Sequence, residues 1–217
     1  MLPLEMAESM SMAEIIPLFP LRSVLFNGGV MPLKIFEPRY LDMVSSCMRE
    51  GSGFGVVLMR EEGTDARWNA ADPQPEIFDF GTLTRITDFE QLPNGMLGIT
   101  TVGQRKFRVL ATFEQDDHLL MGEVEFLPDE SEFALPAEFE GLAGLLRQLL
   151  DHEVVKRLNL TVDLNDGRSV SWRLAELLPL PPEIKQSLLQ MRHPRERLTE
   201  LQRIVDNLAS VGNVRQG

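Results

Sequence analysis

The residues best able to bind a metal or transfer protons are few in this sequence: His118, His152, His193 and Cys47. His152-Glu153 begins like the HExxH pattern of zinc peptidases, but Lys156 stands where the second histidine belongs. A zinc site needs three or four ligands of these types, and the sequence offers no recognisable set. We therefore predict no metal site and a surface or helix-capping role for each histidine.

Motifs for nucleotides and nucleophiles are also incomplete. The segment Gly51–Gly55 (GSGFG) begins like GxGxxG, but Val56 replaces the third glycine and the segment precedes an expected strand instead of following one. The sequence contains neither a GxxxxGKS/T phosphate loop nor a GxSxG nucleophile motif. We therefore predict that this protein is not an enzyme and that it binds no cofactor. An uncharacterised small-molecule enzyme is the alternative, because the sequence contains carboxylate pairs such as Asp116/Asp117. A sequence does not show whether such carboxylates converge in a cleft.

Composition and charge limit the class of protein. The 217 residues are 43% hydrophobic and 25% charged, and no apolar run approaches the roughly 20 residues of a membrane helix. The N-terminus lacks the basic and apolar regions of a signal peptide, and Cys47 has no cysteine partner, so we predict a cytoplasmic protein. Residues 1–130 carry −11 of the net charge of −12, which disfavours nucleic acid and favours basic or neutral partners.

Short apolar or alternating runs bounded by glycine, proline and asparagine predict a β-rich first part. The expected strands are Ile15–Leu18, Gly29–Ile35, Phe54–Met59, Phe78–Phe89, Met96–Leu110 and Leu119–Phe126. Gly103 predicts a bulge or sharp bend in the fifth strand, and Leu92–Gly95 predicts the hairpin turn before it. One helix interrupts the strands between Pro38 and Gly51, because apolar residues recur there at helical spacing.

The pattern becomes helical from about residue 135. Helices are predicted along the apolar stripe 139–149, after a cap at Asp166 or Ser169, after Pro181-Pro182, and from Pro194 onward, where Leu198, Leu201, Val205 and Leu208 share one face. Glu61–Pro75 is polar and aperiodic and predicts a long loop. The expected organisation is a tail at 1–13, a β-rich body at 14–130 and a helical subdomain at 131–217, which makes an α+β fold.

Four segments carry a family resemblance: Ile15–Tyr40 with its prolines, Phe80–Ile86, Leu92–Gly95 and Gly103–Val109. Their order and spacing resemble the LON substrate-binding domain, the N-terminal module of Lon proteases, in its free-standing bacterial form. The resemblance implies a PUA-like open β-barrel with one inserted helix, followed by a C-terminal helical bundle. Asn27 stands where the family has proline before glycine, but asparagine also suits a turn. Lon proteases carry their ATPase and Ser–Lys dyad in other domains.

The resemblance implies a non-catalytic module that binds polypeptide, as a substrate-recognition or adaptor protein in protein quality control. Unfolded or basic polypeptide is the expected ligand, and a protease or chaperone is a candidate partner. The candidate peptide-binding residues are Phe26, Phe36, Arg39 and Tyr40. Burial of Phe26 and bracing of the helix start by Arg39 are the alternatives. A nucleic-acid binder is the rival function, because PUA-like folds include RNA-binding members.

Overall fold

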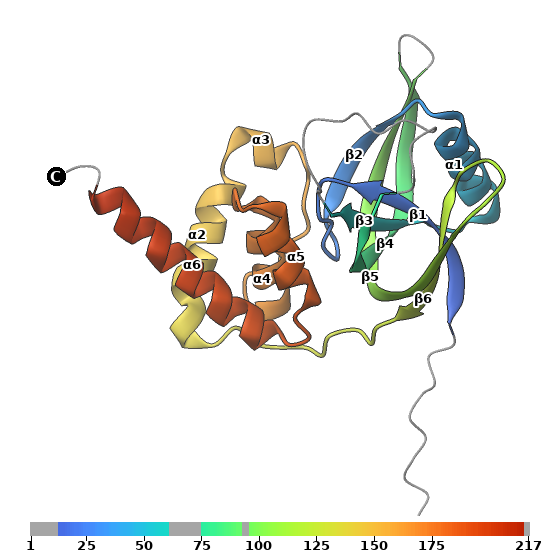
Figure 1. Cartoon of the computed structure of the whole chain (residues 1–217). Helices are drawn as coiled ribbons and strands as arrows, with labels where there is room; N and C mark the ends of the chain where they lie inside the picture. The colour runs from blue at the N-terminus through green and yellow to red at the C-terminus, as the bar shows by residue number, and fades with distance from the viewer. Residues whose placement is uncertain (1–12, 61–74, 93–95, 215–217) are drawn as a thin grey trace, which may run out of the picture.

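The computed structural model of the chain describes residues 13–60, 75–92 and 96–214 (Figure 1). Strands with one inserted helix come first, and helices follow. The strands are β1 (Glu14–Leu21), β2 (Val30–Ile35), β3 (Gly55–Met59), β4 (Ile77–Gln91), β5 (Leu97–Glu114) and β6 (Leu120–Phe126). The helices are α1 (Pro38–Glu50), the 3-10 turn η2 (Ala137–Phe139), α2 (Glu140–Leu150), α3 (Glu153–Lys156), α4 (Gly167–Leu177), α5 (Pro182–Gln190) and α6 (Pro194–Val214).

The six strands form one curled sheet in the order β2-β5-β4-β3-β1-β6, and β5 also pairs with β6. Closure depends on the 18 residues of β5, because one edge of this strand serves two neighbours. Residues 97–102 pair with β2, and residues 107–114 pair with β6. All pairs are antiparallel except β1 with β3. The ring-like sheet with its inserted helix, followed by helices, confirms the predicted α+β fold class.

Gly103 lies where β5 passes the turn between β1 and β2, and this position requires glycine. A Cβ atom at residue 103 would lie 2.3 Å from the carbonyl oxygen of Phe26. Backbone hydrogen bonds hold the two segments together, from Gly28 N to Gly103 O (2.7 Å) and from Gly103 N to Gly29 O (2.9 Å). The register between β4 and β5 shifts at the same place, so the predicted bulge is confirmed.

Helix α1 lies against the sheet and completes an apolar core of its own. It begins at Pro38, since proline suits a first helical turn, and it ends at Gly51, whose φ of 67° lets its N–H bond to the carbonyl oxygen of Cys47. The limits predicted for this helix are confirmed. Its buried side chains pack on apolar residues of the sheet and its turns; this core includes Tyr40, Met43, Val44, Cys47, Phe19, Phe54 and Met121.

The C-terminal helices share their core with three barrel residues, Val24, Phe26 and Leu58. The expected helix starts are confirmed, because the Asp166 carboxylate accepts a hydrogen bond from Arg168 N (2.8 Å) before α4 and prolines begin α5 and α6. The apolar stripe of α6 is buried only in its first half. Leu208 is 53% exposed, because the end of α6 extends beyond the other helices (Figure 1).

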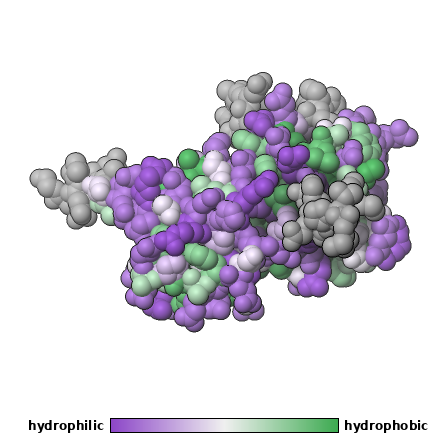
Figure 2. Space-filling model, turned by 90° about the horizontal axis from the view of Figure 1, so that it is seen from below, coloured by the Kyte–Doolittle hydropathy of each residue, from purple (hydrophilic) through white to green (hydrophobic). Residues whose placement is uncertain are grey.

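Three predictions fall mostly on residues outside the described ranges: the tail at 1–13, the loop at 61–75 and the turn at 92–95. The backbone that flanks this turn is paired, since Leu92 N donates to Met96 O (2.8 Å). Within the described ranges, no helix is long and apolar enough to cross a membrane. Hydrophobic residues are visible among polar ones over both the helices and the barrel (Figure 2), so hydropathy alone does not single out a binding face.

Candidate functional site: a cleft between the barrel and the helices

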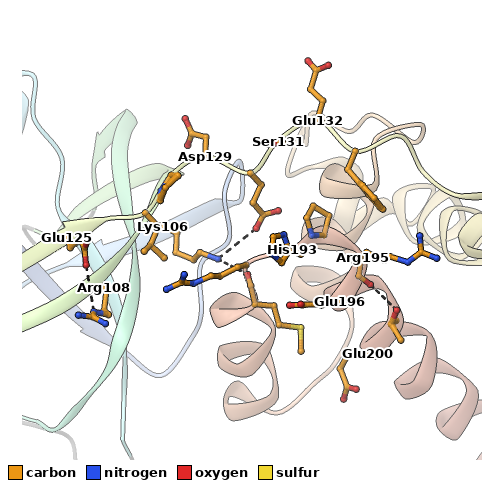
Figure 3. Close-up of a pocket in the computed structure, with 18 residues that line it drawn as sticks. Lys106, Arg108, Glu125, Asp129, Ser131, Glu132, His193, Arg195, Glu196 and Glu200 are labelled. Atoms are coloured by element: carbon orange, nitrogen blue, oxygen red, sulfur yellow. Dashed lines mark hydrogen bonds and ion pairs between the residues drawn. The ribbon is translucent and has the colours of Figure 1, made fainter. Parts of the chain in front are cut away.

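An open cleft of about 990 Å³ lies where the barrel meets the helices (Figure 3). Its walls come from β5 and β6, from the linker at 127–133, and from the turn at 191–193 with the start of α6. Its size is typical of protein cavities that hold ligands, which measure about 300–1,000 Å³. The apolar part of its lining is Leu127, Pro128, Phe133, Met191 and Pro194.

Backbone hydrogen bonds anchor the linker at both ends. Leu127 N donates to Lys106 O (2.9 Å), so the pairing with β5 continues past the end of β6. At the other end, Gly167 N donates to Phe133 O (2.7 Å), which ties the linker to the first residue of α4. One wall of the cleft is therefore attached to the barrel and to the helices at once.

Three charged side chains join the two parts here. Lys106 from β5 and Glu130 from the linker line the cleft, and Arg197 from α6 pairs with Glu130. Arg197 donates to both carboxylate oxygens of Glu130, at 2.9 and 2.6 Å, which is the strong bidentate geometry. Lys106 Nζ lies 3.8 Å from Glu130 Oε1 and donates to the carbonyl oxygens of Leu189 (2.9 Å) and Met191 (2.8 Å). The Arg197 and Glu130 side chains are only 1% and 7% exposed, so this ion pair is buried.

Burial lowers the pKa of Lys106 to about 8, because the ammonium group loses its hydration. The carboxylate of Glu130 opposes this shift, whereas the positive charges of Arg197 and Arg192 add to it. Lys106 therefore remains mostly protonated at neutral pH. The Glu130 carboxylate lies next to two cations, Lys106 and Arg197. This pairing holds the barrel and the helices together, and it differs from the environment of a free general acid or base.

Among the hydrogen bonds of the described residues, none joins a hydroxyl group of the cleft to the imidazole of His193. Ser131, His193 and Thr199 all line the cleft, but the Thr199 hydroxyl donates to the backbone oxygen of Arg195 (2.9 Å) instead. In the described part of the chain, no group of three or more histidine, cysteine, aspartate or glutamate side chains could hold a metal ion. Apolar contact surface inside a charged rim is suited to binding.

A second set of polar contacts fixes the helices to the barrel away from the cleft. Arg173 of α4 donates to the carbonyl oxygen of Asn27 and pairs with Glu176 (2.5 Å), and both side chains are largely buried. Burial raises the pKa of the Glu176 carboxyl and lowers that of Arg173. Gln186 of α5 adds a hydrogen bond from its Nε2 to Phe80 O (2.9 Å). The cleft therefore lies between two parts that buried polar contacts hold together.

The structure places the four residues predicted to bind peptide in different environments. Phe26 is completely buried in the core that the barrel and helices share, whereas Phe36 is 66% exposed between β2 and α1. Arg39 and Tyr40 lie together, with the guanidinium carbon 4.8 Å from the centre of the Tyr40 ring, but both are buried. Of these four, Phe36 is the one open to a ligand. None of them lines the cleft, and their role in binding peptide stays a prediction.

Arg39 makes contacts that fix the start of α1. It donates to the Glu37 carboxylate (2.5 Å) and to the carbonyl oxygen of His118 (2.9 Å) in the turn between β5 and β6. Burial raises the pKa of Tyr40 to about 12, while the charge of Arg39 partly opposes the rise. These contacts agree with the alternative interpretation from the sequence, in which Arg39 braces the helix.

Lys106 and Glu130 of the cleft, and Arg197 that pairs with Glu130, were not identified from the sequence. Glu130 and Arg197 are 67 positions apart, and no spacing rule relates them to each other or to Lys106. One signal was present: Glu130 marks the predicted boundary between the β-rich body and the helical subdomain, where contacts between two parts are expected.

Comparisons with known proteins agree with this architecture. The family model of the ATP-dependent protease La (LON) substrate-binding domain matches residues 15–207. This chain belongs to that family. The crystal structure of a Lon N-terminal domain protein from Xanthomonas campestris is 38% identical to this LON-domain chain, with a TM-score of 0.70, and the match covers 87% of this chain and 97% of the other. The N-terminal domain of Mycobacterium avium complex Lon protease, 16% identical with a TM-score of 0.57, shares the fold.

Whole Lon proteases match over a small share of their length. The Lon protease of Desulfovibrio desulfuricans is 27% identical over 213 residues, which are 92% of this LON-domain chain and 23% of that protease. The Lon protease of Escherichia coli K12 is 26% identical over 88% of this chain and 24% of its own length. The predicted family is therefore confirmed. The similarity concerns about a quarter of those proteases, so their activity as a whole is not carried over.

Proposed function

We propose that this LON-domain protein binds segments of unfolded polypeptide in the cleft between the barrel and the helices, without cleaving them. The observation that carries the proposal is an open, partly apolar cleft whose buried carboxylate, Glu130, is neutralised by Arg197 and Lys106. An extended segment can place apolar side chains against Leu127 and Met191 while its backbone meets the polar rim. The family model, described as a substrate-binding domain, supports the same function.

Fluorescence anisotropy with a labelled, reduced and carboxymethylated protein, which stays unfolded in buffer, tests this proposal. Leu127→Asp introduces a charge into the apolar lining and should weaken binding at least fivefold. Val154→Asp is the matched control, because Val154 is an apolar residue on α3 that is 63% exposed and does not line the cleft. Equal affinity of the Leu127→Asp variant and the wild type, with both folded by circular dichroism, would refute the cleft as the binding site.

Non-catalytic action, a protease or chaperone partner and a cytoplasmic location belong to the same proposal. Incubation of the unfolded protein with the purified chain, with and without ATP and magnesium, tests the first point, and cleavage that survives repurification would contradict it. The net charge of −12 disfavours nucleic acid, the rival ligand. Labelled single-stranded RNA should therefore show no binding that weakens steeply with salt.

A further inference from the structure

A second groove, of about 480 Å³, lies on the opposite side of the barrel sheet from the helical core, between α1, the start of β1 and the turn between β5 and β6. Apolar side chains line it, including Ile15, Ile16, Met43 and Met121. Ile15 stands in this groove with 63% of its surface exposed. Ile15 is therefore open to contact with another molecule, whereas Ile16, Met43 and Met121 form the buried floor beside it.

All the ionisable acidic and basic side chains that line this groove, apart from Cys47, are carboxylates: Glu14, Asp42, Glu50 and Asp117. They come from three separate segments, which are β1, helix α1 (Asp42 in its first half and Glu50 at its end) and the turn before β6. Among the ion pairs of the described residues, none includes any of these four carboxylates. Neither arginine of α1 lines the groove: Arg49 donates to the hydroxyl of Ser46 (3.1 Å), and Arg39 donates to the carbonyl oxygen of His118 (2.9 Å). The groove therefore has a strongly negative rim.

The position of Glu50 is not explained by the stability of α1. Glu50 is the last residue of the helix, where the negative end of the helix dipole disfavours an anion. The four carboxylates do not form a metal site of three or more ligands, since the described residues contain no such group of histidine, cysteine, aspartate or glutamate. Separated negative charges around an apolar surface match several cationic side chains that alternate with aliphatic ones.

We propose that this groove is a docking site for a polypeptide segment in which lysine or arginine alternates with aliphatic residues. Charge complementarity selects this occupant, since every charged lining residue would face a cation. The chain's own first twelve residues, MLPLEMAESMSM, have the wrong charge, because they contain two glutamates and no lysine or arginine. The groove is separate from the cleft at Lys106 and Glu130, so this inference does not rest on the function proposed for the cleft.

The test uses the full chain and a fluorescein-labelled peptide of alternating lysine and isoleucine, compared with a lysine–serine and a glutamate–isoleucine peptide. The groove variant Asp42→Asn/Glu50→Gln removes two charges and should weaken binding of the lysine–isoleucine peptide about tenfold at low salt, from roughly threefold for each exposed charge pair. The matched control Asp88→Asn/Glu90→Gln removes two exposed charges on β4, outside the groove, and should change affinity less than twofold. Ile15→Ser should weaken binding of the lysine–isoleucine peptide but not that of the lysine–serine peptide.

Each other outcome has a definite meaning. Unchanged affinity in Asp42→Asn/Glu50→Gln would overturn the proposal, and equal weakening in both double variants would reduce it to an effect of net charge. Tighter binding after deletion of residues 1–12 would mean that the chain's own tail is the occupant. Binding of the lysine–isoleucine peptide should survive Leu127→Asp, so failure of the groove and failure of the cleft can be told apart.

Discussion

Replacing Arg197 with methionine should destabilise this protein far more than the same change at Arg195, two positions earlier on α6. Both arginines pair with a glutamate at 2.6 Å, so the short N–O distances do not distinguish them. Burial does distinguish them. The side chains of Arg195 and Glu138 are 59% and 54% exposed, whereas those of Arg197 and Glu130 are 1% and 7% exposed.

The expected loss of stability follows from the Glu130 carboxylate, which the substitution leaves buried. Arg197→Met leaves the Glu130 carboxylate buried with only Lys106, 3.8 Å away, and loss of one partner of a buried ion pair costs about 3–5 kcal/mol. For a chain of this length, such a loss lowers the melting temperature by about 6–20 °C, at roughly 2–4 °C per kcal/mol. Arg195→Met should cost less than about 1 kcal/mol, because exposed ion pairs contribute little.

Urea unfolding followed by circular dichroism at pH 7, with thermal melts as a second measurement, gives both values. The double variant Arg197→Met/Glu130→Met should recover a large part of the loss, since no unpaired carboxylate is then buried. A loss for Arg197→Met within about 1 kcal/mol of that for Arg195→Met would refute the reasoning. So would a double variant less stable than Arg197→Met alone.

Four other substitutions have definite expected outcomes. The pKa of Lys106 is about 8 in the folded chain against an ordinary value of 10.5, so the unfolded chain binds more protons between these pH values. The free energy of unfolding of the wild type should therefore rise by up to about 3 kcal/mol relative to that of Lys106→Met from pH 7 to 10.5. A difference that stays constant with pH in urea unfolding would contradict this. Gly53→Ala should cost about 1–3 kcal/mol or more in the same assay, because its Cβ would lie 1.9 Å from Thr84 O. Phe36→Ser should change the free energy of unfolding by less than about 0.5 kcal/mol, because Phe36 is exposed, whereas Tyr40→Ala should lower it by about 3 kcal/mol, because Tyr40 is buried. A loss of affinity for unfolded protein in the Phe36→Ser variant would therefore indicate a direct contact with Phe36.

Much of the fold follows from local patterns in the sequence. Pro38 and Gly51 define the limits of α1, and Asp166 defines the start of α4, because proline, glycine and aspartate act through their own backbone or their nearest neighbours. Gly103 also marks a bulge in the sequence, although what requires glycine there is the close approach of the Phe26 carbonyl oxygen, which lies far away in the sequence. Pro38 and Gly103 also lie in the segments that carry the resemblance to the LON family, which the family model confirms.

The proposed binding surfaces depend on contacts that no local pattern contains. The sequence does not show that β5 is shared between β2 and β6, that Phe26 lies beneath the helices, or that Arg39 is buried at the start of α1. Sequence motifs specify which elements form, because these depend on neighbouring residues. The cleft, the groove and the buried pair of Arg197 with Glu130 arise only when distant segments pack together, because burial and charge pairing are properties of the assembled structure.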